Sequence, residues 1–249
     1  MEVAGHVAAL DAAGRRFVKI LAGADLNAPV PPCPGWDVRE LARHLGGVHR
    51  WATRYVSEAR KSAIDADLEE IVGGWPDDDD LADWLAKGHR ALIAAVAGAP
   101  ADLDCFTFLD APSPLAMWAR RQAHETSIHR VDIESAAAAV TPFPTEFAVD
   151  GVDELVTAFI TRPGRGPRAE SERRLALLPT DDAARWTVRF DADSCHSVRS
   201  AGAADVMAIG TASDLYLWAW NRPTLGEVTF TGDAEVAQVW KETVHVRWS

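Results

Sequence analysis

Apolar residues recur at helical spacing along most of the first 160 residues of the chain. In the first segment, Leu10, Phe17 and Leu21 lie seven and four positions apart, which places them on one face of a helix. The same kind of spacing predicts five helices, over residues 3–24, 37–60, 77–98, 115–139 and 145–160. This part of the chain is therefore expected to be a bundle of helices.

Local signals mark where two of these helices begin. Asp37 is a good N-cap and Glu40 follows three residues later, which is the pattern of a capping box. The stretch 28–35 just before it is rich in proline and is not expected to be helical. Ser113 followed by Pro114 is the preferred pair of residues at the start of the long helix after it.

The pattern changes its period at residue 162. The segment RPGRGPR at 162–168 is not compatible with regular structure and predicts a linker. After it, the alternation of apolar and polar residues in Trp186–Phe190 is typical of a strand. We expect strands over 175–178, 186–190, 195–200, 205–209 and 227–231, with helices after residue 210 and over 233–243. The predicted fold class is α+β, with a helical domain over 1–162, a linker at about 163–171 and a smaller α/β domain over 172–249.

Composition and charge narrow the possible partners. Among 249 residues, 25 Lys and Arg face 37 Asp and Glu, a formal net charge of -12, which disfavours binding to nucleic acid. No apolar run is long enough for a membrane span, and the first residues lack the pattern of a secretory signal. Three widely spaced cysteines argue against a disulfide framework. We expect a soluble protein of the reducing cytoplasm, with neither nucleic acid nor membrane as partner.

The candidate chemistry begins on the helix expected over 115–139. Glu125 and His129 are four residues apart and share one helix face, so they are two possible ligands of a divalent metal. His124 is five residues from His129 and lies on another face, so the segment is not the His-Glu-x-x-His motif of zinc proteases. The alternative is a Glu–His pair on a solvated helix surface.

A third ligand is available on the helix expected over 37–60. His44 and His49 flank its apolar stripe on opposite sides, and each is positioned to border the core of a bundle. Helical periodicity alone does not choose between the two. Bundles do build metal sites from inward-facing residues on neighbouring helices.

Four segments of the chain carry a family resemblance. They resemble the mycothiol-dependent maleylpyruvate isomerase family of actinobacteria. In chain order they are PCPGWDVRELARHLGGVHRW at 32–51, WARRQAHETSIHRVD at 118–132, GTASDLYLWAWNRP at 210–223 and VTFTGD at 228–233. The resemblance implies an N-terminal DinB-like four-helix bundle that binds metal. It also implies a small C-terminal α/β domain similar to sterol-carrier domains.

The resemblance also implies a ligand set. The motifs of the family align with His44, Glu125 and His129, which would hold one divalent metal, usually zinc, and would give His49 a supporting or structural role. Asp132 would orient a ligand imidazole, or would instead form an ion pair with Arg130 or Arg121 on the helix surface. Arg222 would bind a carboxylate of the substrate or thiol. An arginine at this position is also what the dipole at a helix C-terminus favours.

The expected function follows from such a site. A metal lowers the pKa of a bound thiol, and a thiolate adds to an electrophilic, conjugated carbon. The resemblance therefore implies an isomerase or S-transferase that uses mycothiol, or a similar small thiol, on an electrophilic substrate such as maleylpyruvate. Cys33 and Cys105 have no histidine close by in sequence and are weaker candidates for the thiol. The alternative is a non-catalytic metal- or ligand-binding module on the same scaffold.

Overall fold

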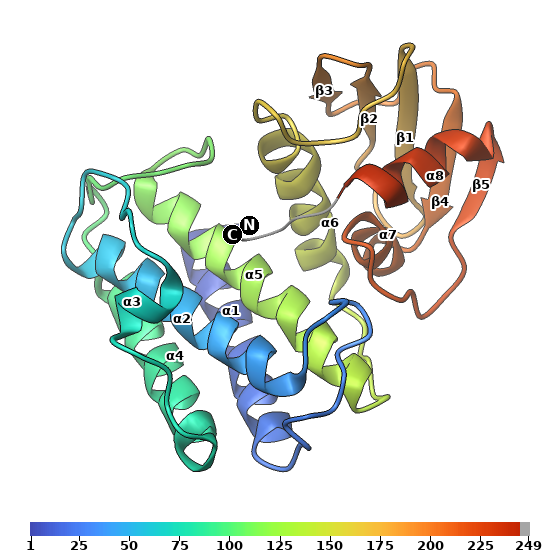
Figure 1. The fold of residues 1–249 in the computed structure, drawn as a ribbon. Coiled ribbons are helices and arrows are strands. Elements are labelled where there is room, and N and C mark those ends of the chain that lie inside the picture. The colour runs from blue at the N-terminus through green and yellow to red at the C-terminus, as the bar shows by residue number, and fades with distance from the viewer. Residues whose placement is uncertain (245–249) are drawn as a thin grey trace. The chain divides into compact units, whose positions relative to one another are not determined.

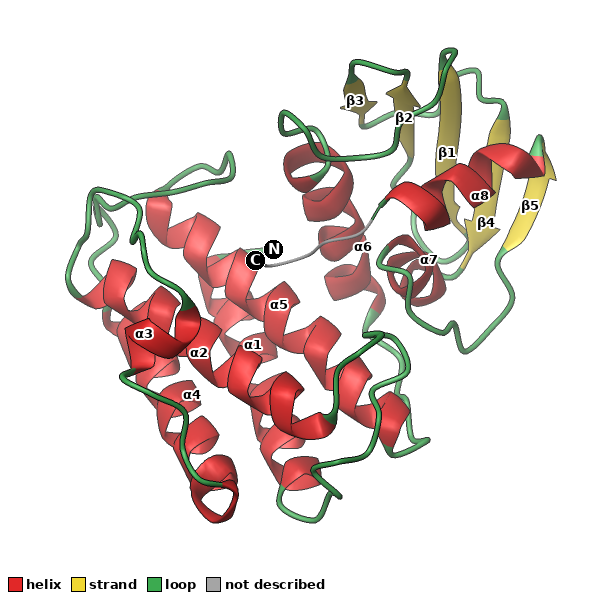
Figure 2. Ribbon diagram, viewed as in Figure 1, coloured by secondary structure: helices red, strands yellow, loops and turns green. Residues whose placement is uncertain are grey.

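A computed structural model describes residues 1–244 of the chain, which divides into two compact units, Met1–Val140 and Thr141–Ser249. Helices make up the first unit, and the second combines helices with one sheet (Figures 1 and 2). The α+β class predicted from the sequence is confirmed. Within residues 1–244, no helix is both long and apolar enough to cross a membrane.

Four long helices form the first unit. They are α1 (Val3–Leu21), α2 (Val38–Ser57), α4 (Leu81–Gly98) and α5 (Pro114–Ala136). The pairs α1 with α5 and α2 with α4 pack along each other, and α2 also contacts α5 (Figure 1). Between α2 and α4 the chain forms the short helix α3 (Leu68–Val72) and the single turn η1 (Asp78–Asp80), which the sequence did not predict as separate elements. The core between the helices contains Phe17, Leu21, Leu41, Leu45, Leu85 and Ile133.

The helix starts predicted from capping residues are confirmed. Asp37 accepts a hydrogen bond from the Glu40 backbone N–H at 2.8 Å, and the Glu40 side chain accepts one from the Asp37 N–H at 3.0 Å. The Ser113 hydroxyl oxygen accepts from the backbone N–H of Ala116 at 3.1 Å, one turn into α5. Each cap satisfies backbone donors that a helix start leaves without partners.

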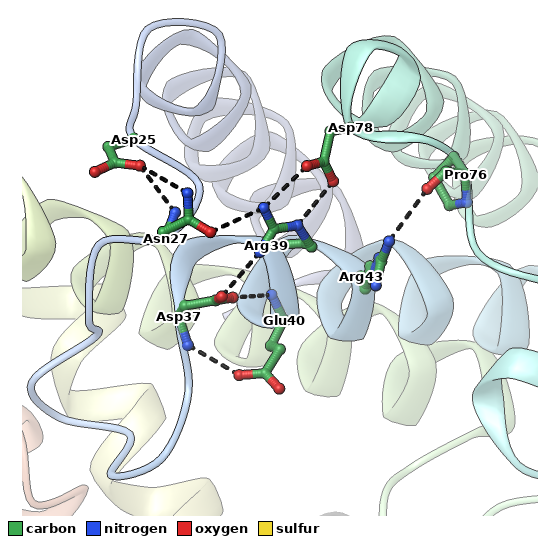
Figure 3. A network of polar contacts seen from close by, with 8 residues as sticks. All are labelled: Asp25, Asn27, Asp37, Arg39, Glu40, Arg43, Pro76 and Asp78. Atoms are coloured by element: carbon green, nitrogen blue, oxygen red, sulfur yellow. Dashed lines mark hydrogen bonds and ion pairs between the residues drawn. The ribbon is translucent and has the colours of Figure 1, made fainter.

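A polar network fixes the loop before α2 to neighbouring elements (Figure 3). The guanidinium of Arg39 donates to both carboxylate oxygens of Asp78, at 2.7 and 2.9 Å, and to Asp37 at 3.0 Å. It also donates to the side-chain oxygen of Asn27 at 3.1 Å. One side chain of α2 therefore joins the loop, the helix cap and η1, and this holds the loop in place where α2 begins.

The first helix of the second unit is α6 (Thr145–Asp153), which continues in a wider helical turn, η2 (Glu154–Phe159). The strands are β1 (Arg173–Pro179), β2 (Trp186–Phe190), β3 (Cys195–Val198), β4 (Val206–Gly210) and β5 (Thr229–Gly232). They form one mixed sheet in the order β3-β2-β1-β4-β5, in which only β1 and β4 run parallel. The helices α7 (Ala212–Ala219) and α8 (Ala234–Thr243) pack on β1 and β4 (Figure 2).

The segment from Thr141 to α6 belongs to the second unit by its contacts. The Phe143 ring lies 5.1 Å from the Tyr216 ring of α7, and its backbone N–H donates to the Ser213 hydroxyl at 3.0 Å. The Phe147 ring of α6 also contacts Tyr216, at 6.3 Å. The chain therefore divides between Val140 and Thr141, and the linker expected at 163–171 lies inside the second unit.

The contact between α2 and α4 gives a stability prediction. A Cβ added at Gly46 would lie 2.0 Å from the ring of Trp84, so Gly46→Ala overpacks this interface. We expect a loss of about 1–3 kcal/mol in the free energy of unfolding, although alanine is the better helix former. Gly98→Ala on α4 is the control, because nothing lies within 4 Å of its added Cβ. Chemical denaturation would contradict the prediction if Gly46→Ala were as stable as Gly98→Ala.

Candidate metal centre

Three buried side chains converge between α2 and α5. Glu125 Oε1 lies 3.4 Å from His44 Nε2 and 3.2 Å from His129 Nε2. One ligand atom of each residue lies within 4.8 Å of those of the other two. The spacing of four residues on α5 brings Glu125 and His129 together, and the packing of α2 on α5 adds His44. The structure thus brings together the three residues expected as ligands.

The donor set fits a divalent ion of the zinc class. Two imidazoles and one carboxylate are common zinc ligands, and three such ligands leave one position of a tetrahedral ion open. The ring centroids of His44 and His129 lie 4.9 Å apart. Two imidazoles that bind one tetrahedral zinc at about 2.0–2.1 Å place their centroids about 5 Å apart. The residues present therefore match the chemistry and the spacing that such an ion requires.

The structure separates His44 from the other candidate histidines. His49 is fully buried, but its Nε2 lies 2.9 Å from the hydroxyl oxygen of Thr126, and its ring lies 5.4 Å from that of His89. The ring of His124 contacts the ring of His6, with centroids 6.1 Å apart. Neither His49 nor His124 joins the group formed by the other three side chains.

Two further side chains form hydrogen bonds to His129 and Glu125 and so hold these two residues in place. Asp132 Oδ2 lies 2.8 Å from His129 Nδ1 and accepts a hydrogen bond from its N–H, which leaves Nε2 directed at Glu125. Asp132 is fully buried, so it is not the surface residue of the alternative interpretation. Arg121 donates to the second carboxylate oxygen of Glu125, Oε2, at 3.3 Å.

The loop before α2 supplies two residues that the sequence analysis did not place at the cluster. Cys33 Sγ lies 3.4 Å from Asp132 Oδ2, and the thiol belongs to a group with His129 and Asp132. The ring of Trp36 lies 4.9 Å from the ring of His44 and stacks on His129 with centroids 6.3 Å apart. These contacts join positions far apart in sequence. The segment 32–51, which resembles the family and contains both residues, was the signal that could have indicated them.

Burial and hydrogen bonding set the charges of the group. Burial disfavours a charge on His129, but hydrogen bonds with Asp132 and Glu125 outweigh it and raise the pKa of His129 to about 9. Burial lowers the pKa of His44, against the contact with Glu125. Burial also disfavours the carboxylate of Glu125, yet its contacts with His129 and His44 hold its pKa well below the usual range. The group therefore contains an ionised Glu125 and a protonated His129 at neutral pH.

Arg222 lies just after α7 in the second unit. Its backbone N–H donates to the carbonyl of Leu217 and its guanidinium to the carbonyl of Trp220, both at 2.8 Å. The arginine thus follows a helix C-terminus, as the sequence indicated. Its expected role in binding a carboxylate stays a prediction.

The fold and this group of residues define an α+β protein whose helical bundle carries a buried His–Glu–His cluster. Two family models match the chain: the mycothiol maleylpyruvate isomerase N-terminal domain over residues 7–134, and the MDMPI C-terminal domain, named by the initials of that enzyme, over residues 146–238. The chain belongs to the mycothiol maleylpyruvate isomerase family.

Solved structures agree with this assignment at the level of the fold. The chain is similar to the crystal structures of the mycothiol-dependent maleylpyruvate isomerase and of a histidine-to-alanine mutant of it. Each match has 18% sequence identity, covers 93% of both chains and has a TM-score of 0.64. A comparison with curated proteins finds no match.

The pKa of His129 leads to a pH prediction for zinc binding. From about pH 7 to 9, His129 is the ligand that must lose a proton, because the pKa values of His44 and Glu125 are lowered. Zinc affinity should therefore rise about tenfold per pH unit and level off near pH 9. Asp132→Asn removes a charge that holds the proton, so its affinity should level off at lower pH. Zinc titrations with a competing chelator would contradict this if the parent affinity were independent of pH.

Proposed function

We propose that the chain is a metal-dependent enzyme that uses a low-molecular-weight thiol, mycothiol or a similar one, as co-substrate. In this proposal His44, Glu125 and His129 hold one divalent ion, of which zinc is the best fit. The reaction is an isomerisation or an S-transfer on a small electrophilic substrate such as maleylpyruvate. The observation that carries the proposal is the convergence of these three buried side chains, in a chain of this family.

Each residue of the cluster has a distinct role in this proposal. The ion supplies the positive charge that lowers the pKa of a thiol. His44, Glu125 and His129 would bind it and leave room for a further ligand. Asp132 would keep the proton on Nδ1 of His129, so that Nε2 stays free for the ion. Trp36 would shield the two imidazoles from water on one side with its ring.

The isomerisation and the S-transfer differ in what happens to the adduct of thiol and substrate. The thiol sulfur adds to a conjugated carbon of the substrate, which converts the neighbouring double bond to a single bond. Rotation about that bond and expulsion of the same thiol give the isomer and return the thiol unchanged. If the new carbon–sulfur bond is retained and the enolate left by the addition takes up the proton that the thiol lost, the reaction is an S-transfer. Arg222 would hold a carboxylate of the substrate or the thiol, because a guanidinium suits planar, two-point binding of carboxylates.

The proposal predicts which substitution removes the metal. Glu125→Gln keeps the size of the side chain but removes the anionic ligand, so zinc affinity should fall at least about tenfold. The bundle has its own apolar core, so we expect the variant to stay folded. His124→Gln on the same helix is the control and should bind zinc like the parent. Equal zinc affinity in Glu125→Gln and the parent would contradict the proposed metal site. A loss of zinc affinity in His124→Gln alone would mean that the ligands lie on the other face of the helix.

A second prediction concerns Arg222 in the second unit. Arg222→Ala should raise the KM for a substrate with a carboxylate by about 10–100-fold, the usual cost of losing a charged hydrogen bond, and should leave the zinc content unchanged. Arg165→Ala, an exposed arginine of the segment 162–168, is the matched control. Steady-state kinetics with maleylpyruvate and several thiols would test both the reaction and this role. An unchanged KM in Arg222→Ala would contradict the role of Arg222.

The alternative remains a binding module that holds a metal or ligand without catalysis. A protein that binds zinc through the three ligands but turns over no electrophile with any thiol would favour this alternative. A protein that binds no zinc would contradict both the enzyme and the metal-binding module.

A further inference from the structure

A second buried polar contact joins α2 and α5 beside the candidate metal centre. His49 Nε2 and the hydroxyl oxygen of Thr126 lie 2.9 Å apart, and both side chains are fully buried. Thr126 directly follows Glu125 on α5, and His49 lies five residues after His44 on α2. Two polar pairs therefore join α2 and α5: His44 with Glu125, which are candidate metal ligands, and His49 with Thr126, which are not.

The position of His49 is fixed from other helices as well. Its ring contacts the ring of His89 on α4 with centroids 5.4 Å apart. His89 in turn packs closely against Gly14 of α1, where an added Cβ would lie 2.2 Å from the His89 ring. Burial lowers the pKa of His49 well below the ordinary value, which favours the neutral imidazole. His49 thus stands as a neutral hydrogen-bonding group with little freedom to move.

Two contacts constrain a helix more strongly than one. Five residues of helix span about 7.5 Å, so His44 and His49 contact α5 at two separated points along α2. The His44–Glu125 pair at 3.4 Å is the longer contact, and the His49–Thr126 pair at 2.9 Å is a normal hydrogen bond. Because breaking a buried hydrogen bond leaves groups without partners, the second pair resists sliding and rotation of α2 against α5.

We infer that His49 and Thr126 are positioning residues, which set α2 against α5 so that His44 meets Glu125 and His129 before a metal binds. The inference rests on the proposed metal site. It assigns to the His49–Thr126 pair a share of the metal affinity, although neither side chain is a ligand.

The test measures zinc affinity in variants of Thr126. Thr126→Val keeps the shape of the side chain but removes the hydroxyl, so zinc affinity should fall about tenfold, as is usual for contacts outside the ligand shell. Thr126→Ser keeps the hydroxyl and should restore the affinity of the parent. Thr53→Val is the matched control, because its hydroxyl donates to the His49 carbonyl within α2 and does not reach α5. Thr126→Ala repeats the test if the valine variant does not fold.

Melting temperatures of the metal-free variants separate positioning from simple stability. A purely structural role would lower the melting temperature of Thr126→Val and leave its zinc affinity unchanged at a temperature where all variants are folded. That result, with normal zinc binding by the parent, overturns the inference alone. Absence of zinc binding in the parent overturns the proposed function and the inference together. Reduced affinity in Thr126→Val, with parent-like values in Thr126→Ser and Thr53→Val, supports the inference.

Discussion

The first unit is organised around a carboxylate that is buried in a helical bundle. Removing the Glu125 charge from water is costly unless other groups compensate for it. Here His44, His129 and Arg121 all lie within 3.4 Å of its oxygens, and they come from α2 and α5. The two helices must therefore pack in the one arrangement that supplies these partners. A bundle held by apolar contacts alone would tolerate more than one such arrangement.

The charges of the cluster partly balance one another. With His129 protonated, its positive charge lies between the carboxylates of Glu125 and Asp132, at 3.2 and 2.8 Å. A proton on His129 thus balances part of the negative charge that a divalent ion would otherwise balance. In the proposed metal site, binding of the ion would release this proton from His129.

Sequence reasoning succeeded where the determining interactions are local. The starts of α2 and α5 depend on Asp37 and Ser113, whose caps reach only three residues along the chain. The shared face of Glu125 and His129 follows from helix geometry in the same way. The division of the chain into two units has no such local signal, because α6 is helical whichever unit it joins. Its contacts with α7, and its hydrogen bonds to Asp181, Trp186 and Arg199, assign it to the second unit, and all of these partners are distant in sequence.

The composition of the site depended more on long-range packing. Helical periodicity left His44 and His49 equivalent, because they flank the same apolar stripe, and the resemblance to the family selected His44. The structure separates them by their partners on α5, Glu125 for one and Thr126 for the other. Cys33 and Trp36 were not identified, because no spacing rule relates a loop to a helix face about ninety residues later. The capping residues of α2 do, however, determine where that loop ends.

The loop and α2 act together at the cluster. The Arg39 network joins Asn27, Asp37 and Asp78 around the first turn of α2, and Trp36 and His44 lie on either side of that turn. An inserted or deleted residue within α2 between Val38 and His44 would rotate His44 by about 100° relative to the start of the helix and move it away from Glu125. The spacing from the loop through the capping box to His44 is therefore itself a constraint on the site. The capping box, which can be recognised in the sequence, thus helps to place His44 against Glu125, a contact that the sequence alone does not reveal.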